Sequence, residues 1–472
     1  MANLRIIASN AARRATLTAS STDGLLAVTN LVSDKKSDVW RATSTTARVS
    51  GVLPSPELAS GAALLGNFSP STTMRVRLSN EQPVKNLWLN SGLATSWGGG
   101  TTTVRTANAA LAPDGTATAT TVVPDSSTGS HYADRTIAAE SGSYVNGEYY
   151  TTSVFVKAAG ISLVRLNQAA AVVGAAGKYA QFDLSAGVIS ASNSYTADIK
   201  AYPNGWFRIS VTNIIDNAGA EPSRVLSRLT LSGSNTTWTQ SFAGNGVDGV
   251  IVFAPQYEKG NKATSYYPST STAGTRPFGY IDSWQSYDYD SGFVLACPAP
   301  AIQLEGWTAA QSASAYAYGG GAYARAWFPE TQFRGFAIDM VDTSNLQGYI
   351  EASKLVIGRY WSPPYGLSSL SQTDVDGATH YSTAAGDLLS RASTISKEVS
   401  IEMRALQPAD RSRLADILRA SRAYPIFVSV RAGDVDLDVE RAHTVLGKRM
   451  GDSEVTLEMA QRYGSKVTVR SI

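Results

Sequence analysis

The sequence predicts a mainly β protein built from several β-sandwiches or jelly rolls, with one α-helix close to its C-terminal end. Its 472 residues are enough for about two to four domains. The 40 glycines and 22 tyrosines favour a turn-rich, strand-rich chain over a helical one. Short apolar runs separated by polar turn clusters recur along most of the chain, as expected for many antiparallel strands.

Residues 1–80 read as short strands that are too few to close a sandwich. The run Leu4–Ser9 alternates weakly, and Met74, Val76 and Leu78 fall on one face of a strand. The segment Pro54–Leu58 is the only one here that could begin a short helical turn. This first part of the chain therefore needs further strands from elsewhere in the sequence.

Residues 86–272 look like a complete domain. Seven strand-like runs fall at Ala117–Val123, Glu148–Ala158, Ser162–Ala169, Lys178–Gly187, Gly205–Ile215, Arg224–Gly233 and Gly249–Gly260. Turn signals stand at Pro113–Gly115, Asn204–Gly205 and Gly244–Gly246. This spacing predicts an antiparallel sandwich or jelly roll.

Strand patterns like those of the first 80 residues return after Thr275, in Ala324–Asp342 and Leu346–Pro364. We therefore predict one sandwich divided between residues 1–82 and 278–365, with a second, residues 83–277, inserted into one of its loops. Such insertions are tolerated because the ends of compact domains often lie close together. The alternative, a series of domains that follow one another along the chain, stays open.

Residues 366–472 predict a β-sandwich with one flanking helix. The helix falls in Gln407–Pro425, with Leu414, Ile417 and Leu418 on one stripe and a proline just beyond its end. Strand patterns lie on both sides of this helix.

The composition argues against several functional classes. The net charge of +2 gives no field that favours nucleic acid or an anionic membrane. Cys297 is the only cysteine, so an intrachain disulfide is impossible and a cysteine-based zinc site is not expected. No run of 18 apolar residues and no signal peptide pattern is found, so we predict no membrane insertion and synthesis in the cytoplasm.

The segment Phe253–Pro277, with the opening run Asn86–Trp97 and the turn-strand Gly205–Ile209, resembles the carbohydrate-binding-like jelly rolls of bacteriophage tail and fibre proteins. Those modules close with a run of the type Q-x-E-x-G-x-x-A-T-S-Y-I-P-T. The matching positions here are Gln256, Glu258, Gly260, Ala263, Thr264, Ser265, Tyr266 and Pro268. Tyr267 replaces the usual aliphatic residue, and Ser269 replaces a threonine. The motif is specific to the type of module but not to a ligand.

The divided sandwich resembles the discoidin-like jelly rolls of siphophage and prophage tail-tip proteins. The stretches that carry this resemblance are Asn30–Val49, Asn67–Ser79, Tyr289–Phe293 and Phe333–Tyr365. In that family the strand ending near Leu78 runs almost directly into the Tyr-Asp-Ser-Gly turn, so an interruption at this point supports an insertion. The pattern of residues 366–472 is similar to the tail-tube-like fold of distal tail proteins, which assemble into rings.

These resemblances imply a structural component of a phage tail tip or baseplate, located in the virion and made in the host cytoplasm. Its expected partners are copies of itself in a ring, other tail proteins and, through the inserted jelly roll, host-surface glycan. Two alternatives stay open. One is a purely structural tail protein whose insert is a decoration or a fibre-attachment point, and the other is a glycan-active enzyme with binding modules.

No catalytic arrangement, cofactor site or metal site is predicted. The three histidines, His131, His380 and His443, stand near no serine or aspartate in a recognised arrangement. The acids Asp282, Asp288 and Asp290 are predicted to serve turns, because Asp-Ser-Gly is a common turn sequence. Asp114 and Asp183 could join a calcium site, but turn roles are favoured because no Asp-x-Asp loop spacing is present.

A glycan site needs exposed aromatic faces and a few planar polar groups. The candidates that we select in the insert are Trp238, Trp97, Tyr179, Trp206 and Tyr257. Trp238 is the leading candidate because it lies in a polar stretch with few apolar neighbours. Trp206 alternates with Phe207, so one of the two must face the core, and a core role for Trp206 stays open. In the divided sandwich, Trp40 is expected to fill the core, and Arg41 and Arg75 are expected to form salt bridges or to lie in solvent.

Overall fold

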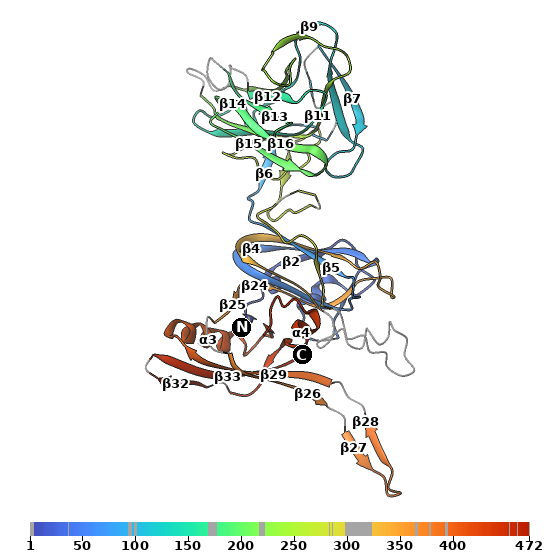
Figure 1. Ribbon diagram of the computed structural model, residues 1–472, viewed down its shortest axis with the longest axis vertical. Helices are drawn as coiled ribbons and strands as arrows, with labels where there is room; N and C mark the ends of the chain where they lie inside the picture. The colour runs from blue at the N-terminus through green and yellow to red at the C-terminus, as the bar shows by residue number, and fades with distance from the viewer. Residues whose placement is uncertain are drawn as a thin grey trace. The chain divides into compact units, whose positions relative to one another are not determined.

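The computed structural model describes residues 4–471 except 36, 93–96, 99–101, 169–176, 217–221, 283, 286, 298–322, 364–366, 377–378, 392–394, 453 and 460. The chain forms two compact units. One, here called the split unit, comprises Met1–Asn80 and Tyr287–Ile472, and the other, the inserted unit, comprises Glu81–Ser286. Strands dominate both units, which confirms the predicted fold class (Figure 1).

The segments near the two ends of the inserted unit pair with each other. Strand β6 (Val84–Asn86) pairs antiparallel with β20 (Gly274–Arg276). The buried side chain of Arg276 donates to Glu81 Oε2 at 2.9 Å and to the carbonyl oxygen of Gln82 at 2.6 Å. Entry and exit of the chain are therefore adjacent, the geometry that an insertion into a loop requires. The predicted boundaries of 83–277 and the names of the domain types stay predictions.

The first sheet of the split unit contains β2 (Thr16–Ala19), β3 (Trp40–Arg41), β4 (Thr46–Gly66), β5 (Thr73–Ser79), β21 (Tyr289–Asp290), β22 (Val294–Leu295), β23 (Tyr323–Val341) and β24 (Glu351–Gly358). The long strands β4 and β23 pair in two stretches separated by register shifts. Both stretches of β4 contribute to one core, through Val49 and Leu64 among others. The helical turn predicted at Pro54–Leu58 is wrong, because these residues continue β4.

Trp40 is fully buried in this core, and its indole nitrogen donates to the carbonyl oxygen of Ser21. Two 3-10 helices, η1 (Ala11–Arg14) and η2 (Val28–Val32), also pack here. Arg41 pairs with Glu351 at 2.6 Å, and Arg75 pairs with Asp290. The expected core role of Trp40 and the salt bridges of the two arginines are thus confirmed.

The second sheet of the split unit contains β1 (Arg5–Ile7), β25 (Tyr360–Trp361), β26 (Leu367–Asp376), β29 (Ile395–Leu406), β30 (Ile426–Ser429), β31 (Thr444–Arg449), β32 (Val455–Met459) and β33 (Arg462–Ser471). A hairpin of β27 (Thr379–Ser382) and β28 (Leu388–Arg391) follows β26 (Figure 1). The predicted domain of residues 1–82 includes Arg5–Ile7, whereas this strand pairs with β30 and β25. Its side chains explain the placement, because Leu4 and Ile6 are buried in the core of this sheet.

Helix α3 (Pro408–Ala420) covers this core with Leu414, Ile417 and Leu418, as predicted. Gln407 and Asp410 form a capping box, and Pro408 occupies the first helical position. A second short helix, α4 (Leu437–Ala442), was not predicted from the sequence; Asp436 caps it by accepting from two backbone N–H groups. No helix in the described part of the chain is long and apolar enough to cross a membrane.

A buried ion pair joins the two sheets of the split unit. Arg325 of β23 donates through two nitrogens to Glu440 Oε2 of α4, at 2.9 and 2.7 Å. The indole nitrogen of Trp327 donates to the other oxygen of the same carboxylate. The side chain of Glu440 is fully buried, and that of Arg325 is 11% exposed. Apolar residues from both sheets, including Leu65, Tyr323 and Phe427, surround this contact.

The inserted unit is a two-sheet sandwich. The six-stranded sheet follows the order β15 (Thr196–Tyr202), β16 (Trp206–Ile214), β11 (Tyr149–Ala159), β19 (Gly249–Lys259), β8 (Ala119–Pro124) and β7 (Thr103–Ala110). The five-stranded sheet follows the order β10 (Tyr132–Ala138), β17 (Arg224–Leu231), β12 (Leu163–Gln168), β13 (Lys178–Asp183) and β14 (Val188–Ser192). A short pair, β9 (Thr128–Ser130) with β18 (Ser241–Ala243), and the 3-10 turn η4 (Pro203–Gly205) complete it.

The six-stranded sheet of the inserted unit is covered on both sides. Its inner side meets the five-stranded sheet across a core that includes Val154, Val211 and Val252. A second apolar cluster, which contains Phe155, Trp206, Phe253 and Tyr266 with the partly buried Trp284, lies elsewhere on the same strands. The alternation of side chains along a strand assigns the two clusters to opposite sides.

The Gln-x-Glu motif holds the end of the inserted unit in place. The fully buried Glu258 accepts hydrogen bonds from Gln256 Nε2 at 2.8 Å and from the backbone N–H of Thr264 at 2.9 Å. The hydroxyl of Thr264 donates to the second carboxylate oxygen, and Gln256 Oε1 accepts from the backbone N–H of Tyr267. Burial raises the pKa of Glu258, which these hydrogen bonds partly oppose. The motif therefore has a structural role.

Candidate glycan-binding face

The outer side of the five-stranded sheet carries polar and aromatic side chains. Along β12, Val164 and Leu166 are buried in the sandwich core, so Arg165 and Asn167 point to the opposite side. Residues of the neighbouring strands share this side with them. We call the following set the aromatic–arginine face: Tyr132, Asp134, Arg165, Asn167, Tyr179, Gln181, Arg228 and Trp238.

The strand register places these residues in two rows across the sheet. One row runs through Tyr132, Thr230, Arg165 and Gln181, and the next runs through Asp134, Arg228, Asn167 and Tyr179. Each row crosses β10, β17, β12 and β13, which spans about 14 Å at the usual distance between strands. The face is therefore wider than a single sugar ring.

Arg165 lies between two aromatic rings. Its guanidinium carbon is 4.2 Å from the ring centre of Tyr179 and 4.0 Å from that of Trp238. Its Nε donates to Gln181 Oε1 at 3.1 Å, and Gln181 in turn donates to Ser190. Partial burial lowers the pKa of Arg165, and Tyr179 opposes this effect. The cation–π contacts and the hydrogen bond together fix the plane of the guanidinium group.

Trp238 is held by the loop that follows β17. The buried hydroxyl of Ser232 accepts from the backbone N–H of Thr239 at 2.9 Å and from that of Ser234 at 3.3 Å. The hydroxyl of Ser234 accepts hydrogen bonds from the backbone N–H groups of Thr236 and Thr237. Such local hydrogen bonds stabilise compact turns, so this polar stretch is ordered and holds the indole over Arg165.

A second aromatic–arginine pair lies beside the first. The guanidinium carbon of Arg228 is 3.8 Å from the ring centre of Tyr132, and Asp134 accepts from Arg228 Nη2 at 3.0 Å. Asp134 is 7% exposed and the side chain of Arg228 is 30% exposed, so the ion pair is partly buried. The pair stiffens one end of the face and neutralises its charge there.

Two polar atoms on the face have no protein partner. Asn167 Oδ1 and Trp238 Nε1 are both buried and unpaired among the described residues. A buried acceptor or donor without a partner lowers stability by about 1–3 kcal/mol, and neither of these atoms is open to a ligand unless the surrounding side chains move. The groups here that a sugar-binding site can use are the exposed parts of the aromatic rings and the exposed polar groups beside them.

The structure brings two of the five predicted site residues together and excludes three. The rings of Trp238 and Tyr179 both pack on Arg165 and are partly exposed. Trp97, Trp206 and Tyr257 are 4%, 2% and 0% exposed, so their prediction as glycan-binding residues is wrong. A ring enclosed in the core has no face to offer a ligand.

Each of the three buried rings has a structural place. Trp97 packs edge-on against Trp88 with ring centres 4.8 Å apart, and Tyr257 stacks on Tyr150 in the main core. Trp206 belongs to the second apolar cluster, the core role that was left open for it.

Sequence reasoning missed Arg165, Asn167, Arg228 and Tyr132. The run Ser162–Ala169 did carry a signal, because its polar residues alternate with its apolar ones. The alternation does not show which residues lie next to Arg165 on the neighbouring strands. Those neighbours depend on the strand register, which involves residues far apart in the sequence.

The acids that were considered for catalysis or calcium serve turns and strand ends. Asp114 accepts from the backbone N–H of Thr116, and Asp183 accepts from that of Ser185. Asp282, Asp288 and Asp290 likewise accept from backbone N–H groups of Gln285, Asn80 and Gly292. Within the described residues, no group of three or more His, Cys, Asp or Glu side chains could hold a metal ion.

The histidines have local partners. His131 is fully buried, with its two ring nitrogens 2.6 and 3.0 Å from the carbonyl oxygens of Thr102 and Phe242. His443 Nδ1 lies 2.8 Å from the carbonyl oxygen of Val439. His380 contacts Ser390 at 2.7 Å, a pairing that the sequence analysis missed. These two residues face each other across an exposed hairpin, and no acid is bonded to the histidine in the described structure.

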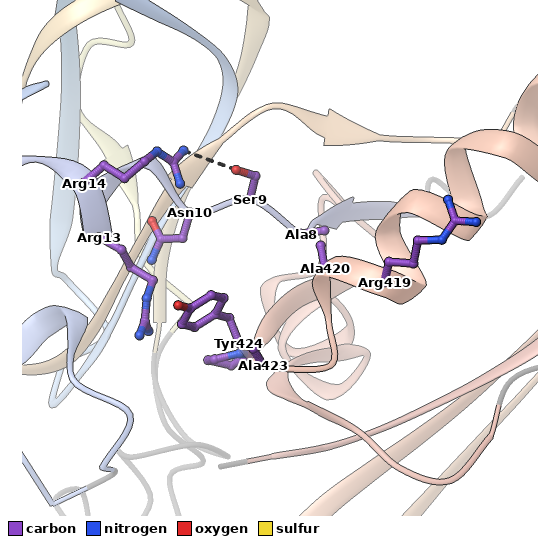
Figure 2. Close-up of a pocket in the computed structure, with 10 residues that line it drawn as sticks. Ala8, Ser9, Asn10, Arg13, Arg14, Arg419, Ala420, Ala423 and Tyr424 are labelled. Carbon is purple, nitrogen blue, oxygen red and sulfur yellow. Dashed lines mark hydrogen bonds between the residues drawn. The ribbon is translucent and has the colours of Figure 1, made fainter. Parts of the chain in front are cut away.

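A pocket with a volume of about 650 Å³ lies in the split unit, between η1 and the end of α3. Figure 2 shows Arg13 beside Tyr424 and Arg14 hydrogen-bonded to Ser9. Its arginines already have acidic partners: Arg13 pairs with Asp34, Arg14 with Glu57 and Arg419 with Asp416. The pocket therefore offers a ligand less uncompensated charge than the aromatic–arginine face.

No family model matches the sequence, and no curated protein matches it either. Among solved structures, the chain is similar to the enzymatically active domain of bacteriophage CBA120 tailspike protein 4, with 13% identity and a TM-score of 0.22 over 37% of this chain and 21% of that one. It is also similar to the baseplate tripod BppUct-A-L of bacteriophage Tuc2009, with 14% identity and a TM-score of 0.22 over 62% of this chain and 98% of that one.

A third similar structure is the CBM22-1–GH10 part of Clostridium thermocellum xylanase 10B complexed with xylohexaose, with 16% identity and a TM-score of 0.20. That match covers 40% of this chain and 30% of the xylanase chain. The chain thus spans less than a third of the tailspike and xylanase structures. At these identities and TM-scores the similarities carry no argument about function, which rests on the residues themselves.

Proposed function

We propose that the protein is a structural component of a phage tail tip or baseplate, and that its inserted unit binds host-surface glycan through the aromatic–arginine face. The split unit would dock the protein in the particle, against copies of itself in a ring and against other tail proteins. The location in the virion follows from this role. The proposal involves no catalysis, cofactor, nucleic acid or membrane insertion.

The observation that carries the glycan proposal is the arrangement around Arg165. The partly exposed rings of Trp238 and Tyr179 both pack on its guanidinium group, which is also hydrogen-bonded to Gln181. Rigid aromatic surfaces with a few oriented polar groups suit a sugar, which presents an apolar ring face and a rim of hydroxyls. Weak individual contacts would add up through the several copies on one particle.

The tail role is supported by the sequence resemblances of the divided sandwich and of residues 366–472. Labelling of purified particles with an antibody against the chain tests it. We expect gold label at one end of the tail, in several copies per particle. Label on the capsid, or none on intact particles, would contradict the tail role.

The glycan role is tested with the full-length chain on immobilised host polysaccharide. We expect binding that Trp238→Ala weakens by about tenfold or more, since truncating a tryptophan that anchors an interface costs on the order of 2 kcal/mol. Circular dichroism must show that the variant folds.

The purely structural alternative is favoured by one observation. Arg165 already covers one face of Tyr179 and one face of Trp238, which leaves less aromatic surface for a ligand. On that view the pair stabilises the loop after β17. It predicts that Trp238→Ala lowers the melting temperature of the inserted unit while the wild-type chain binds no host polysaccharide.

A further inference from the structure

The two arginines of the aromatic–arginine face differ in their charge partners. Arg228 is neutralised by Asp134 at 3.0 Å. Arg165 has no acidic partner among the described residues, and the side chain that it binds, Gln181, is neutral. The nearest acid along β13, Asp183, is engaged in a turn with Ser185.

The two terminal nitrogens of Arg165 are free to bind. The hydrogen bond to Gln181 uses Nε, and neither Nη1 nor Nη2 has a partner in the described structure. Neither atom is among the buried unpaired ones, so both are open to solvent. The contacts with the rings of Tyr179 and Trp238, together with the Nε hydrogen bond to Gln181, restrict the direction of the edge that carries these nitrogens.

An arginine edge that is held in place and uncompensated is suited to two acceptor oxygens of one anionic group. Guanidinium binds carboxylate and phosphate through two parallel hydrogen bonds, and charge-assisted bonds are about twice as strong as neutral ones. Partial burial strengthens the interaction further, because water screens it less.

We propose that the glycan bound by this face is acidic, and that Arg165 binds its carboxylate or phosphate group while the exposed parts of the Trp238 and Tyr179 rings contact the adjoining sugar. This inference rests on the proposed glycan-binding function. Uronic-acid polymers and phosphate-linked polymers both supply such a group. A neutral polysaccharide would leave the guanidinium without an anion.

The experiment compares three probes on the full-length chain by isothermal titration calorimetry. The probes are tetragalacturonate, its methyl ester and a glycerol phosphate oligomer. The ester keeps the sugar skeleton but lacks the charge. We expect at least one acidic probe to bind about tenfold or more tightly than the ester, with affinity that falls as salt is added. The acidic probe that binds identifies the source of the anion.

Arg165→Gln should weaken binding of the acidic probe by about tenfold or more and weaken binding of the ester less, so that the preference for the acidic probe over the ester is lost. Arg165→Lys, which keeps the charge but loses the planar fork, should lie between the two. Arg224→Gln is the matched control, because Arg224 is an exposed arginine six residues along β17 from Thr230, the partner of Arg165. Arg224 lies about 20 Å from Thr230 along the strand, so removing its charge should leave binding of all three probes unchanged.

Equal binding of acid and ester, unaffected by Arg165→Gln but lost in Trp238→Ala, would overturn the acidic-glycan inference and leave the glycan-binding function in place. Absence of binding to all three probes would also overturn it. Binding of host polysaccharide, measured in parallel, then decides whether the proposed function fails as well.

Discussion

Glu440→Gln should destabilise the split unit strongly. Glu440 is fully buried and is the charge partner of Arg325, whose side chain is only 11% exposed. The substitution leaves this guanidinium without its anion and places amide hydrogens against its N–H groups. Removing one partner of a buried ion pair lowers the free energy of unfolding by about 3–5 kcal/mol.

The matched control is Glu330→Gln. Glu330 and Arg359 also form an ion pair, but their side chains are 40% and 52% exposed. Exposed pairs contribute about 0–1 kcal/mol, so this variant should be close to wild type. A second test is the double variant Glu440→Gln with Arg325→Met, which removes the stranded charge and should recover part of the loss.

The assay is urea unfolding of the full-length chain, followed by tryptophan fluorescence and circular dichroism. Because the chain has two compact units, the data are fitted to two transitions, and only one of them should move. For a unit of this size, the corresponding fall in melting temperature is roughly 10 °C. If Glu440→Gln and Glu330→Gln change stability equally, the ion pair does not hold the two sheets together as argued.

Two further predictions concern buried polar groups. Lys397 is 8% exposed, and burial lowers its pKa from 10.5 to about 8. Between pH 8 and pH 10.5 the lysine is protonated in the unfolded chain but not in the folded chain, so the free energy of unfolding rises with pH. The wild type should therefore gain up to about 2 kcal/mol over Lys397→Met between pH 8 and pH 9.5 in urea unfolding, and a constant difference would refute this. The hydroxyl of Tyr257 is buried without a partner among the described residues, so Tyr257→Phe should raise stability by about 1 kcal/mol in thermal unfolding and leave glycan binding intact. Weaker binding by that variant would place Tyr257 in the site after all.

Elements with strong local signals were predictable from the sequence. All seven strand runs of the insert lie on strands of the structure, and α3 (Pro408–Ala420) lies within the predicted range Gln407–Pro425. These features depend on neighbours within a few residues.

Features set by distant contacts were not predictable in the same way. The alternation of Trp206 and Phe207 could not show which ring lies in which cluster, because the six-stranded sheet packs apolar residues on both sides. The strand Arg5–Ile7 joins a sheet whose other members begin more than 350 residues later. These three residues show no pattern that indicates which strand they pair with.

For the same reason, the sequence predicted part of the candidate site, Trp238 and Tyr179, but not Arg165. Trp238 stood out because a tryptophan in a polar stretch has little to bury it, and it is indeed partly exposed. Arg165 gained its importance only through strand pairing, which places Tyr179 on one side of it and the loop after β17 on the other.

The central claim is that the inserted unit binds host-surface glycan through the aromatic–arginine face. The most direct measurement is binding of the fluorescently labelled full-length chain to host cells, with host polysaccharide as competitor. Trp238→Ala is compared with Tyr195→Ala, which removes a 57% exposed aromatic ring of the same unit that does not belong to the face. We predict binding that the polysaccharide competes away, that Trp238→Ala abolishes and that Tyr195→Ala retains. Absence of cell binding by the folded wild-type chain, or equal binding by both variants, would contradict the claim.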